Sequence, residues 1–435
     1  SPSSGSLSVP LEVGRPSGDR TATGTVVELN LPENGPRTGP SVVSELMPDA
    51  HSVSVGVWVA VGGRDEDPSM SGASHFLEHL LFKGTERRTA RAIAELVDST
   101  GGEMNAFTSK EYTAYYARLP AGGQEMATAL LADVLREPAL RAADVETERQ
   151  VILEEIHLQA DDPDDVVFGL LYEALFPGHP LGREVLGTES SVAAIDRDGI
   201  SGFHEHWYRA PNLVVAAAGA VDHDALVAQV AEAFSGRTGG SAPVRAAPVA
   251  EPVEAVCLKR PTEATHVAWG WRGLRRDDPR RHALALGIHV LGGGLSSRLF
   301  QTVREERGLA YSVFSSMAGY TDAGVVSVYA GTAPERADEL QKVVAGEVAE
   351  AAANGITAAE MAIARDGFEG SILLGLEDSG SRMSRLGTSQ SLMGRVVPLD
   401  EYVETLRAVT LEDVNAVLAE VLSPEPAVAI VGSGT

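Results

Sequence analysis

Cysteine is almost absent from this sequence of 435 residues, which contains only Cys257. A single cysteine cannot form an internal disulfide, so packing and hydrogen bonds must hold the fold together. Cys257 lies in the apolar, strand-like run VEAVCLKR. This setting predicts a buried, inert thiol and argues against a cysteine nucleophile.

Basic residues are also scarce. The chain has 35 Lys and Arg against 61 Asp and Glu, which gives a formal net charge of −26 at pH 7. Such a charge repels nucleic acids and anionic membrane surfaces, so we expect neither as a partner, whereas basic peptides are favoured. A role in solubility alone explains the charge equally well.

Long apolar runs are missing as well, although 44% of the residues are hydrophobic. No uninterrupted stretch approaches the roughly 20 apolar residues that a membrane-spanning helix needs. The first residues, SPSSGSLSVPLEVG, lack the basic-then-apolar pattern of a secretory signal. The composition therefore predicts a globular protein, and we expect a cytoplasmic one.

Length and composition together predict two domains, because a single hydrophobic core rarely serves so long a chain. Residues 1–24 are rich in Ser, Gly and Pro, which is typical of a flexible arm. Residues 235–252, SGRTGGSAPVRAAPVAEP, have the composition of a linker. We therefore expect one domain at 25–234 and a second at 253–435.

The two expected domains share an order of elements. In each, an alternating strand precedes a helix and a pair of strands, and the domain closes with a helix that leads into a buried β-run. This repetition predicts an α+β fold that uses one unit twice, each unit being an antiparallel sheet with helices packed on one face. The expected strands are 53–62, 101–109, 113–119, 265–274, 310–318 and 324–331.

The segment SGASHFLEHLLFKGT, which begins at Ser71, predicts an apolar helix interrupted by three polar residues, with Ser71 or Ser74 as its cap. His75, Glu78 and His79 stand at positions i, i+3 and i+4 and so share one face. Two imidazoles so spaced can bind one zinc ion, while the carboxylate serves as general base. Alternatively the three side chains pair only with one another, but burying them without a ligand is unfavourable.

A third ligand is expected on a second helix, VETERQVILEEIHLQADDPDD, at 145–165. Glu148 and Glu155 lie seven residues apart on one helical face, whereas Glu154 points about 100° away from Glu155. Such a pair can supply one metal ligand and one carboxylate that orients a ligating histidine. Without the histidine helix, a solvated acidic helix would be the better interpretation of this segment.

These motifs resemble those of the pitrilysin/insulinase family of zinc peptidases. The run from His75 to His79 is the inverted zinc motif H-x-x-E-H, and GGEMNAFTSKEYTAYYARL, ERQVILEEI and LFQTVREERGLAYSV follow it in order. The sequence is most similar to the short bacterial branch related to the mitochondrial processing peptidase β subunit. The resemblance covers residues 45–435 and implies a zinc-binding first domain and a clamshell-type dimer.

The resemblance also implies a role for each residue of the motifs. It makes His75 and His79 zinc ligands, Glu155 the third ligand and Glu78 the catalytic base. Glu148 corresponds to the acidic residue that supports the ligands. Only one zinc ion per chain is implied, because the second domain has no H-x-x-E-H motif.

The run Asn105, Ala106, Phe107 and Thr108 resembles the edge strand to which substrates of the family add their own backbone. Binding of this kind, called β-augmentation, relies on main-chain hydrogen bonds and demands little of the substrate's sequence. Considered alone, Asn105 would be interpreted as a turn or bulge residue.

In the second domain, Arg304 and Tyr311 match the family pair that binds the scissile carbonyl. A guanidinium and a phenol can both donate hydrogen bonds to a developing oxyanion, which makes the two residues catalytic candidates. A purely structural tyrosine at a strand start would be equally ordinary. The resemblance implies a homodimer in which each active site combines the first domain of one chain with the second domain of the other.

The sequence thus predicts a zinc-dependent endopeptidase that hydrolyses short or unfolded peptides. One alternative is a non-catalytic assembly or binding subunit of the same family, although such a subunit has no need to keep the whole ligand set. Another is a protease dedicated to processing one precursor, which the motifs do not distinguish from a general peptidase.

Overall fold

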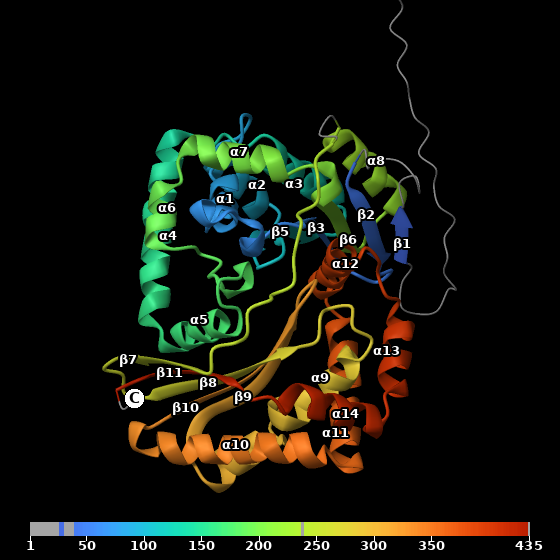
Figure 1. Cartoon of the computed structure of the whole chain (residues 1–435). Coiled ribbons are helices and arrows are strands. Elements are labelled where there is room, and N and C mark those ends of the chain that lie inside the picture. Colours follow the sequence, from blue (N-terminus) through green and yellow to red (C-terminus); the bar gives the residue numbers. More distant parts are fainter. Residues whose placement is uncertain (1–25, 30–38, 236–238, 434–435) are drawn as a thin grey trace, which may run out of the picture.

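The computed structural model describes residues 26–29, 39–235 and 239–433. It contains two β-sheets, each with its own set of helices, as the predicted α+β fold requires (Figure 1). We call the chain from β1 to α8 the first half and the chain from β7 to β11 the second half. The arm expected at 1–24 lies outside the described residues.

The sheet of the first half has six strands in the order β1-β2-β6-β3-β5-β4. Strands β2 and β6 run parallel, and the other neighbours are antiparallel. The pair β1 and β2 extends the sheet beyond the expected strands, because neither segment is long enough to show a clear alternation. The strands are β1 Val26–Leu29, β2 Ser41–Leu46, β3 Ser52–Val59, β4 Glu103–Thr108, β5 Thr113–Pro120 and β6 Leu213–Gly219.

The sheet of the second half repeats this topology with five strands in the order β7-β11-β8-β10-β9. Again one pair, β7 and β11, is parallel and the others are antiparallel. The shared strand order supports the interpretation that one unit is used twice. The strands are β7 Ala255–Lys259, β8 Thr265–Gly273, β9 Ala310–Gly319, β10 Gly324–Thr332 and β11 Ala427–Gly432.

Each half buries one face of its sheet against its own helices, whose apolar side chains form one large core per half. No helix in the described ranges is long and apolar enough to cross a membrane. The helices of the first core are α1 Ala73–Leu81, α2 Ala90–Asp98, α3 Gln124–Arg136, α4 Ala142–Asp161, α6 Glu189–Ala194, α7 Arg197–Trp207 and α8 His223–Ala233. Those of the second core are α9 Arg281–Gly292, α10 Ala337–Asn354, α11 Ala358–Gly375, α13 Leu399–Ala408 and α14 Leu411–Leu422.

The opposite face of each sheet is covered by a helix from the other half, a layer that the sequence analysis did not include. Helix α5 (Pro163–Leu175) of the first half packs on β8 and β11. Helix α12 (Ser379–Met393) of the second half packs on β2, β3 and β6. Its approach is close, because a Cβ at Gly387 would lie 2.3 Å from the ring of the buried Trp58.

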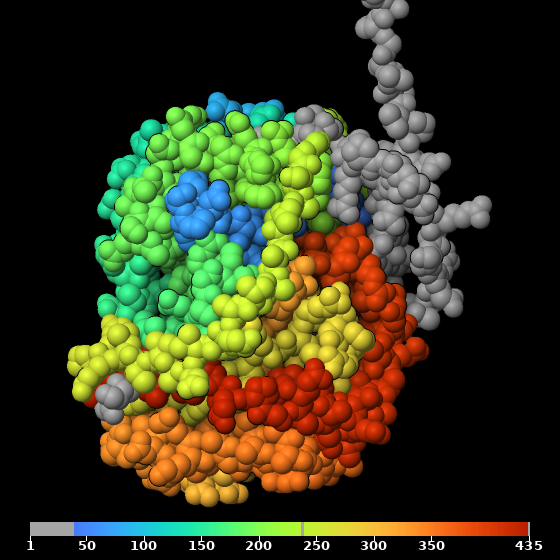
Figure 2. All heavy atoms as spheres, viewed as in Figure 1, coloured from blue at the N-terminus to red at the C-terminus, as the bar shows by residue number. Residues whose placement is uncertain are grey.

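Residues 239–254 connect the halves without forming a helix or strand, and Figure 2 shows them running over the surface from one half to the other. Arg245 in this segment is only 2.7 Å from Asp65 of the first half. Nearby, Arg64 pairs with Glu111 at 2.7 Å and with Asp322 of the second half at 2.9 Å. These mostly buried ion pairs tie the linking segment and both halves together.

Cys257 is exposed, so the prediction of a buried thiol was wrong. It lies on β7, which is an edge strand and, in the part of the chain that the structure describes, pairs with β11 alone. The apolar run around it had suggested a buried strand, but most of the side chains of β7 are exposed at the edge.

Candidate metal centre

Helix α1 places its apolar side chains in the first core and its polar side chains on the opposite face. Phe76, Leu77 and Leu80 are almost completely buried. The other face presents His75 and His79, whose side chains are 13% and 19% exposed. The 3.6-residue period of the helix accounts for this separation, since the polar positions fall on one side.

The start of α1 is capped by an acidic side chain from the preceding loop. The carboxylate of Glu66 accepts hydrogen bonds of 2.7 Å from the backbone N–H groups of Gly72 and Ser74. Gly72 has φ +94°, and a Cβ there would lie 2.5 Å from the carbonyl oxygen of Leu186. The expected serine cap is therefore absent, and burial raises the pKa of Glu66 to about 7.

The three predicted ligands, His75, His79 and Glu155, lie together. Their ligand atoms all fall within 4.8 Å of one another. The Oε2 atom of Glu155, on α4, is 3.7 Å from Nε2 of His75 and 3.6 Å from Nε2 of His79. These distances exceed hydrogen-bond length but are close to the roughly 3.3–3.4 Å edge of a tetrahedron with zinc bonds of ~2.0–2.1 Å. The donor set therefore fits a zinc ion with one open coordination position.

His75 is suited to metal binding by its charge state. Burial, with a smaller contribution from His79, lowers the pKa of His75 to about 4, so the imidazole is neutral at pH 7. A metal ligand must be neutral in this way, because the coordinating nitrogen needs a free lone pair. The other nitrogen, Nδ1, is buried and has no hydrogen-bond partner among the described residues.

Glu148 orients the second histidine. It is almost completely buried, and its Oε2 atom lies 3.2 Å from Nδ1 of His79. Because a carboxylate accepts hydrogen bonds, it holds the proton on Nδ1 and leaves Nε2 free to bind a metal. Lys83, just past the end of α1, reaches the other oxygen of Glu148 at 2.7 Å.

Glu78, the predicted base, lies beside the ligands and contacts the edge strand. Its Oε2 atom accepts a hydrogen bond of 2.5 Å from the hydroxyl of Thr108, the last residue of β4. Burial raises the pKa of Glu78, Glu155 adds to the rise, and Thr108 and His79 oppose it. A raised pKa makes the carboxylate a stronger base near neutral pH.

Strand β4, which contains the predicted run from Asn105 to Thr108, is an edge of the first sheet, and β5 is its one partner among the described strands. Asn105 is exposed, and its Oδ1 atom accepts a hydrogen bond of 2.8 Å from the backbone N–H of Ala106. Phe107 packs against the rings of Tyr112 and Tyr116 on the neighbouring strand and turn. An added strand could therefore pair with the outer edge of β4 after displacing the Asn105 side chain.

Arg304 and Tyr311 lie against each other, with the guanidinium carbon 4.8 Å from the centre of the tyrosine ring. Arg304 is in the single π-helix Phe300–Glu306 of the described residues, and Tyr311 is on the edge strand β9 and 84% exposed. In the described part of the chain, none of the hydrogen bonds, ion pairs or ring contacts joins either residue to the three ligands. The structure thus places Arg304 and Tyr311 beside each other, with no described contact to His75 or His79.

Comparison with known proteins finds two family matches, which meet within the first half, at α6. Residues 41–189 match the family Insulinase (Peptidase family M16), and residues 194–368 match Peptidase M16 inactive domain. The chain belongs to peptidase family M16. An uncharacterized zinc protease of Mycobacterium tuberculosis (strain ATCC 25618 / H37Rv) is 46% identical over 399 residues, 91% of each chain. The uncharacterized zinc protease YmxG of Bacillus subtilis (strain 168) is 37% identical over 398 residues, 91% of this chain and 96% of that protein.

Solved structures share the two-part M16 fold. A protease from Helicobacter pylori superimposes with a TM-score of 0.86 at 22% identity, covering 94% of this chain and 99% of that one. A structure titled peptidase M16 inactive domain, from Pseudomonas fluorescens, has the same TM-score at 24% identity and covers 94% and 98% of the two chains. At such identities the likeness shows the fold alone.

Two side chains of this M16 site were missed from the sequence. Lys83 lies just past the end of α1, and no spacing in the sequence relates it to Glu148 on α4. Glu66 lies in a loop, where no periodicity relates it to α1. Only its position in the fold shows that it caps the helix that carries the histidines.

Proposed function

We propose that this chain is a zinc-dependent endopeptidase that hydrolyses short or unfolded peptides. The observation that carries the proposal is the meeting of His75, His79 and Glu155 around one point, with Glu78 beside them. Zinc bound there would act as a Lewis acid on the scissile carbonyl and would lower the pKa of a bound water.

The chain's own residues supply the remaining chemistry of the proposed reaction. Glu78 accepts the proton of the attacking water and later donates it to the leaving amine. The hydroxyl of Thr108 holds the carboxylate of Glu78 in place. The backbone of β4 aligns the peptide as an added strand, so the scissile bond can reach the ligands without a specific side-chain pocket.

Completion of the site by a second copy of the chain is part of the proposal. Arg304 is partly exposed and Tyr311 is exposed, the two are stacked, and neither has a described contact to the ligands of its own chain. Facing the ligands of a partner, they would donate hydrogen bonds to the oxyanion. A homodimer with two enclosed sites would admit short or unfolded peptides, and the charge of −26 favours basic ones.

The test is the Glu78→Gln variant. It should retain one zinc per chain, measured by atomic emission, because the three ligands are untouched. Its turnover of a peptide library, followed by mass spectrometry, should fall by a factor of about 10²–10⁴. The exposed Glu154→Gln change on α4 is the matched control and should keep full activity. Full turnover in Glu78→Gln would exclude Glu78 as the base.

A non-catalytic subunit is the second candidate, and the match of residues 194–368 to the M16 inactive domain favours it. This candidate predicts that the purified chain holds no stoichiometric zinc and cleaves nothing in the library. Cleavage confined to one precursor would instead indicate a dedicated processing protease.

A further inference from the structure

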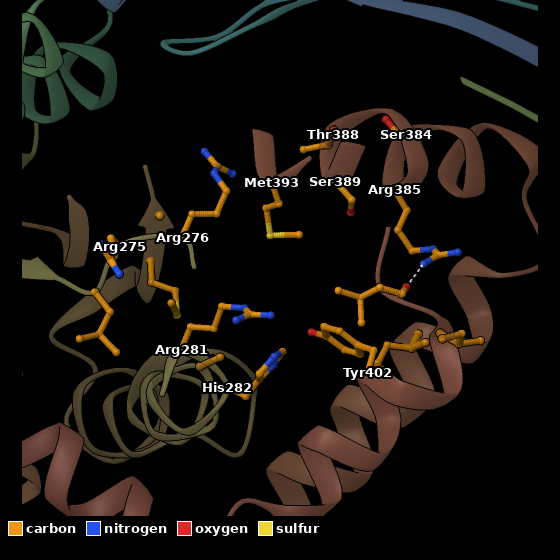
Figure 3. Close-up of a pocket in the computed structure, with 17 residues that line it drawn as sticks. Arg275, Arg276, Arg281, His282, Ser384, Arg385, Thr388, Ser389, Met393 and Tyr402 are labelled. Carbon is orange, nitrogen blue, oxygen red and sulfur yellow. Dashed lines mark hydrogen bonds between the residues drawn. The ribbon is translucent and has the colours of Figure 1, made fainter. Parts of the chain in front are cut away.

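A cavity of about 700 Å³ lies away from the metal centre, between the start of α9, helix α12 and the start of α13 (Figure 3). Its volume is in the range of small-molecule sites. Most of its surface is apolar, with Ile372, Met393 and Leu399 among the lining residues. None of the lining residues belongs to α1, α4 or β4, which carry the candidate metal centre and its edge strand.

The charge of this cavity is opposite to that of the protein. No lining residue is acidic, whereas four are arginines, in a chain with a net charge of −26. Three of the arginines already have carboxylate partners: Arg275 pairs with Asp277 at 2.8 Å, Arg276 with Glu111 at 2.8 Å and Arg385 with Glu45 at 3.0 Å.

Arg281 is the exception. Its guanidinium donates one long hydrogen bond of 3.3 Å to the backbone carbonyl of Asp278, and it has no carboxylate partner among the described residues. Figure 3 shows its side chain extending from α9 into the space beneath α12. Arg281 and His282 are the first residues of α9, so the positive end of the helix dipole adds to the charge there.

His282 is a second polar side chain of the cavity that lacks a hydrogen-bond partner in the described part of the chain. It is 5% exposed, lines the cavity and makes no hydrogen bond to any described residue, and its ring centre lies 4.9 Å from that of Tyr402. Buried imidazoles normally have such a partner. Arg281 and His282 thus offer neighbouring donors to one acceptor group in the cavity.

From these observations we infer that the cavity is a binding site for an amphipathic monocarboxylate, such as a medium-chain fatty acid. The carboxylate accepts hydrogen bonds from Arg281 and His282, and the alkyl chain lies against Ile372, Met393 and Leu399. A guanidinium suits this role because its N–H groups match both oxygens of a carboxylate. The site is separate from the proposed peptidase centre and does not depend on it.

The experiment is calorimetric titration of the full chain with octanoate and, in parallel, with 1-octanol, which has the same chain length and no charge. Octanoate should bind with one site per chain, about tenfold to a hundredfold more tightly than octanol, as expected for a charge-assisted hydrogen bond. Addition of a zinc chelator should leave both affinities unchanged.

The decisive variant is Arg281→Met, which keeps an apolar stem. Its affinity for octanoate should fall to that for octanol, while octanol binding stays as in the wild type and shows that the cavity is intact. Arg281→Lys should restore part of the octanoate affinity. Arg275→Met, which removes a lining arginine that is already paired, is the control and should change binding less than about twofold.

Three results would overturn the inference. They are absence of octanoate binding at millimolar concentration, equal affinities for octanoate and octanol, and equal losses in Arg281→Met and Arg275→Met. A peptide ending in an apolar residue carries the same chemistry at its C-terminus. N-acetyl-leucyl-leucine is therefore titrated as well, and its binding in place of octanoate would assign the cavity to peptide C-termini.

Discussion

The side chains of the candidate metal centre have different contacts and therefore different expected roles. His75 and His79 share one carboxylate oxygen of Glu155 at 3.7 and 3.6 Å, while buried Glu148 fixes the ring of His79. The ligands set whether a metal can bind, and the orienting residue sets how tightly it binds. These two roles can be separated by single substitutions.

Glu148→Gln is expected to weaken zinc binding by about tenfold to a hundredfold, because the amide no longer accepts the His79 hydrogen bond as a charged group and can present N–H instead. Competition with a chromophoric chelator measures the change. Glu154→Gln, an exposed neighbour of Glu155, is the control and should bind zinc as the wild type does. Unchanged affinity in Glu148→Gln would show that His79 is oriented by other contacts.

Glu66 is expected to make the stability of the fold pH-dependent. Its pKa is raised from 4.5 to about 7, so between these values the folded chain keeps a proton that the unfolded chain has released. Stability relative to Glu66→Gln should therefore fall, by on the order of 3 kcal/mol, as the pH rises from about 4.5 to 7, and should then level off.

Urea unfolding at several pH values, with chelator present so that metal loss does not contribute, measures this difference. The exposed Glu125→Gln variant reports any pH dependence unrelated to the buried carboxyl. A wild-type-to-variant difference that stays constant from pH 4.5 to 8 would contradict the expected titration of Glu66.

Much of the candidate site was predictable at this scale because helical spacing alone relates His75 to His79 and Glu148 to Glu155. Helical geometry set Glu154 aside, and family resemblance then selected Glu155 over Glu148 as the ligand. The capping role of Glu66 was not predictable, since it depends on a loop folding back onto α1. Likewise, the apolar run around Cys257 does not reveal that β7 is an edge strand.

At the scale of secondary-structure elements, the strands could be predicted from the sequence. The helix that covers the second face of each sheet could not. The six expected strands correspond to β3, β4, β5, β8, β9 and β10, because each has a clear alternation or a bounded apolar run. The positions of α5 and α12 could not be predicted in this way. An amphipathic pattern shows that a helix covers an apolar surface, but not that the surface belongs to the other half.

The packing of α12 makes Gly387 sensitive to any added side chain. Gly387→Ala places a methyl group 2.3 Å from the ring of Trp58, so the helix must move off the sheet. We expect a loss of about 1–3 kcal/mol in the free energy of unfolding. Gly370→Ala, in α11 with open space around it, should instead be neutral or stabilising by up to about 1 kcal/mol. Thermal unfolding of both variants gives the comparison, and equal effects would refute close packing at Gly387.

For the whole molecule, the main question is how the candidate ligands and the Arg304/Tyr311 pair could act on one substrate, as the proposed function requires. They lie in different halves, and no described contact joins them within the chain. The proposed assembly of two chains, each contributing one half to each site, would allow this without rearranging either half.

Shared sites predict that two inactive variants restore each other. Glu78→Gln chains supply Arg304 and Tyr311, and Arg304→Ala chains supply Glu78. Random pairing of equal amounts makes half of the dimers mixed, with one complete site each, so about a quarter of the wild-type activity should return. Pairing Glu78→Gln with the double variant is the control and should restore none. No recovery in dimers proven to be mixed would mean that each site is formed within one chain.

Because α5 covers the sheet of the second half and α12 covers the sheet of the first half, neither half has a complete core by itself. A gene fragment encoding only the first half would lack α12 and would expose the apolar face around Trp58, and a fragment encoding only the second half would lack α5. Such products should aggregate when made alone and should be rescued by co-expression. A single proteolytic nick within 239–254, by contrast, leaves both helices docked, so the nicked protein should migrate as one species until it is denatured.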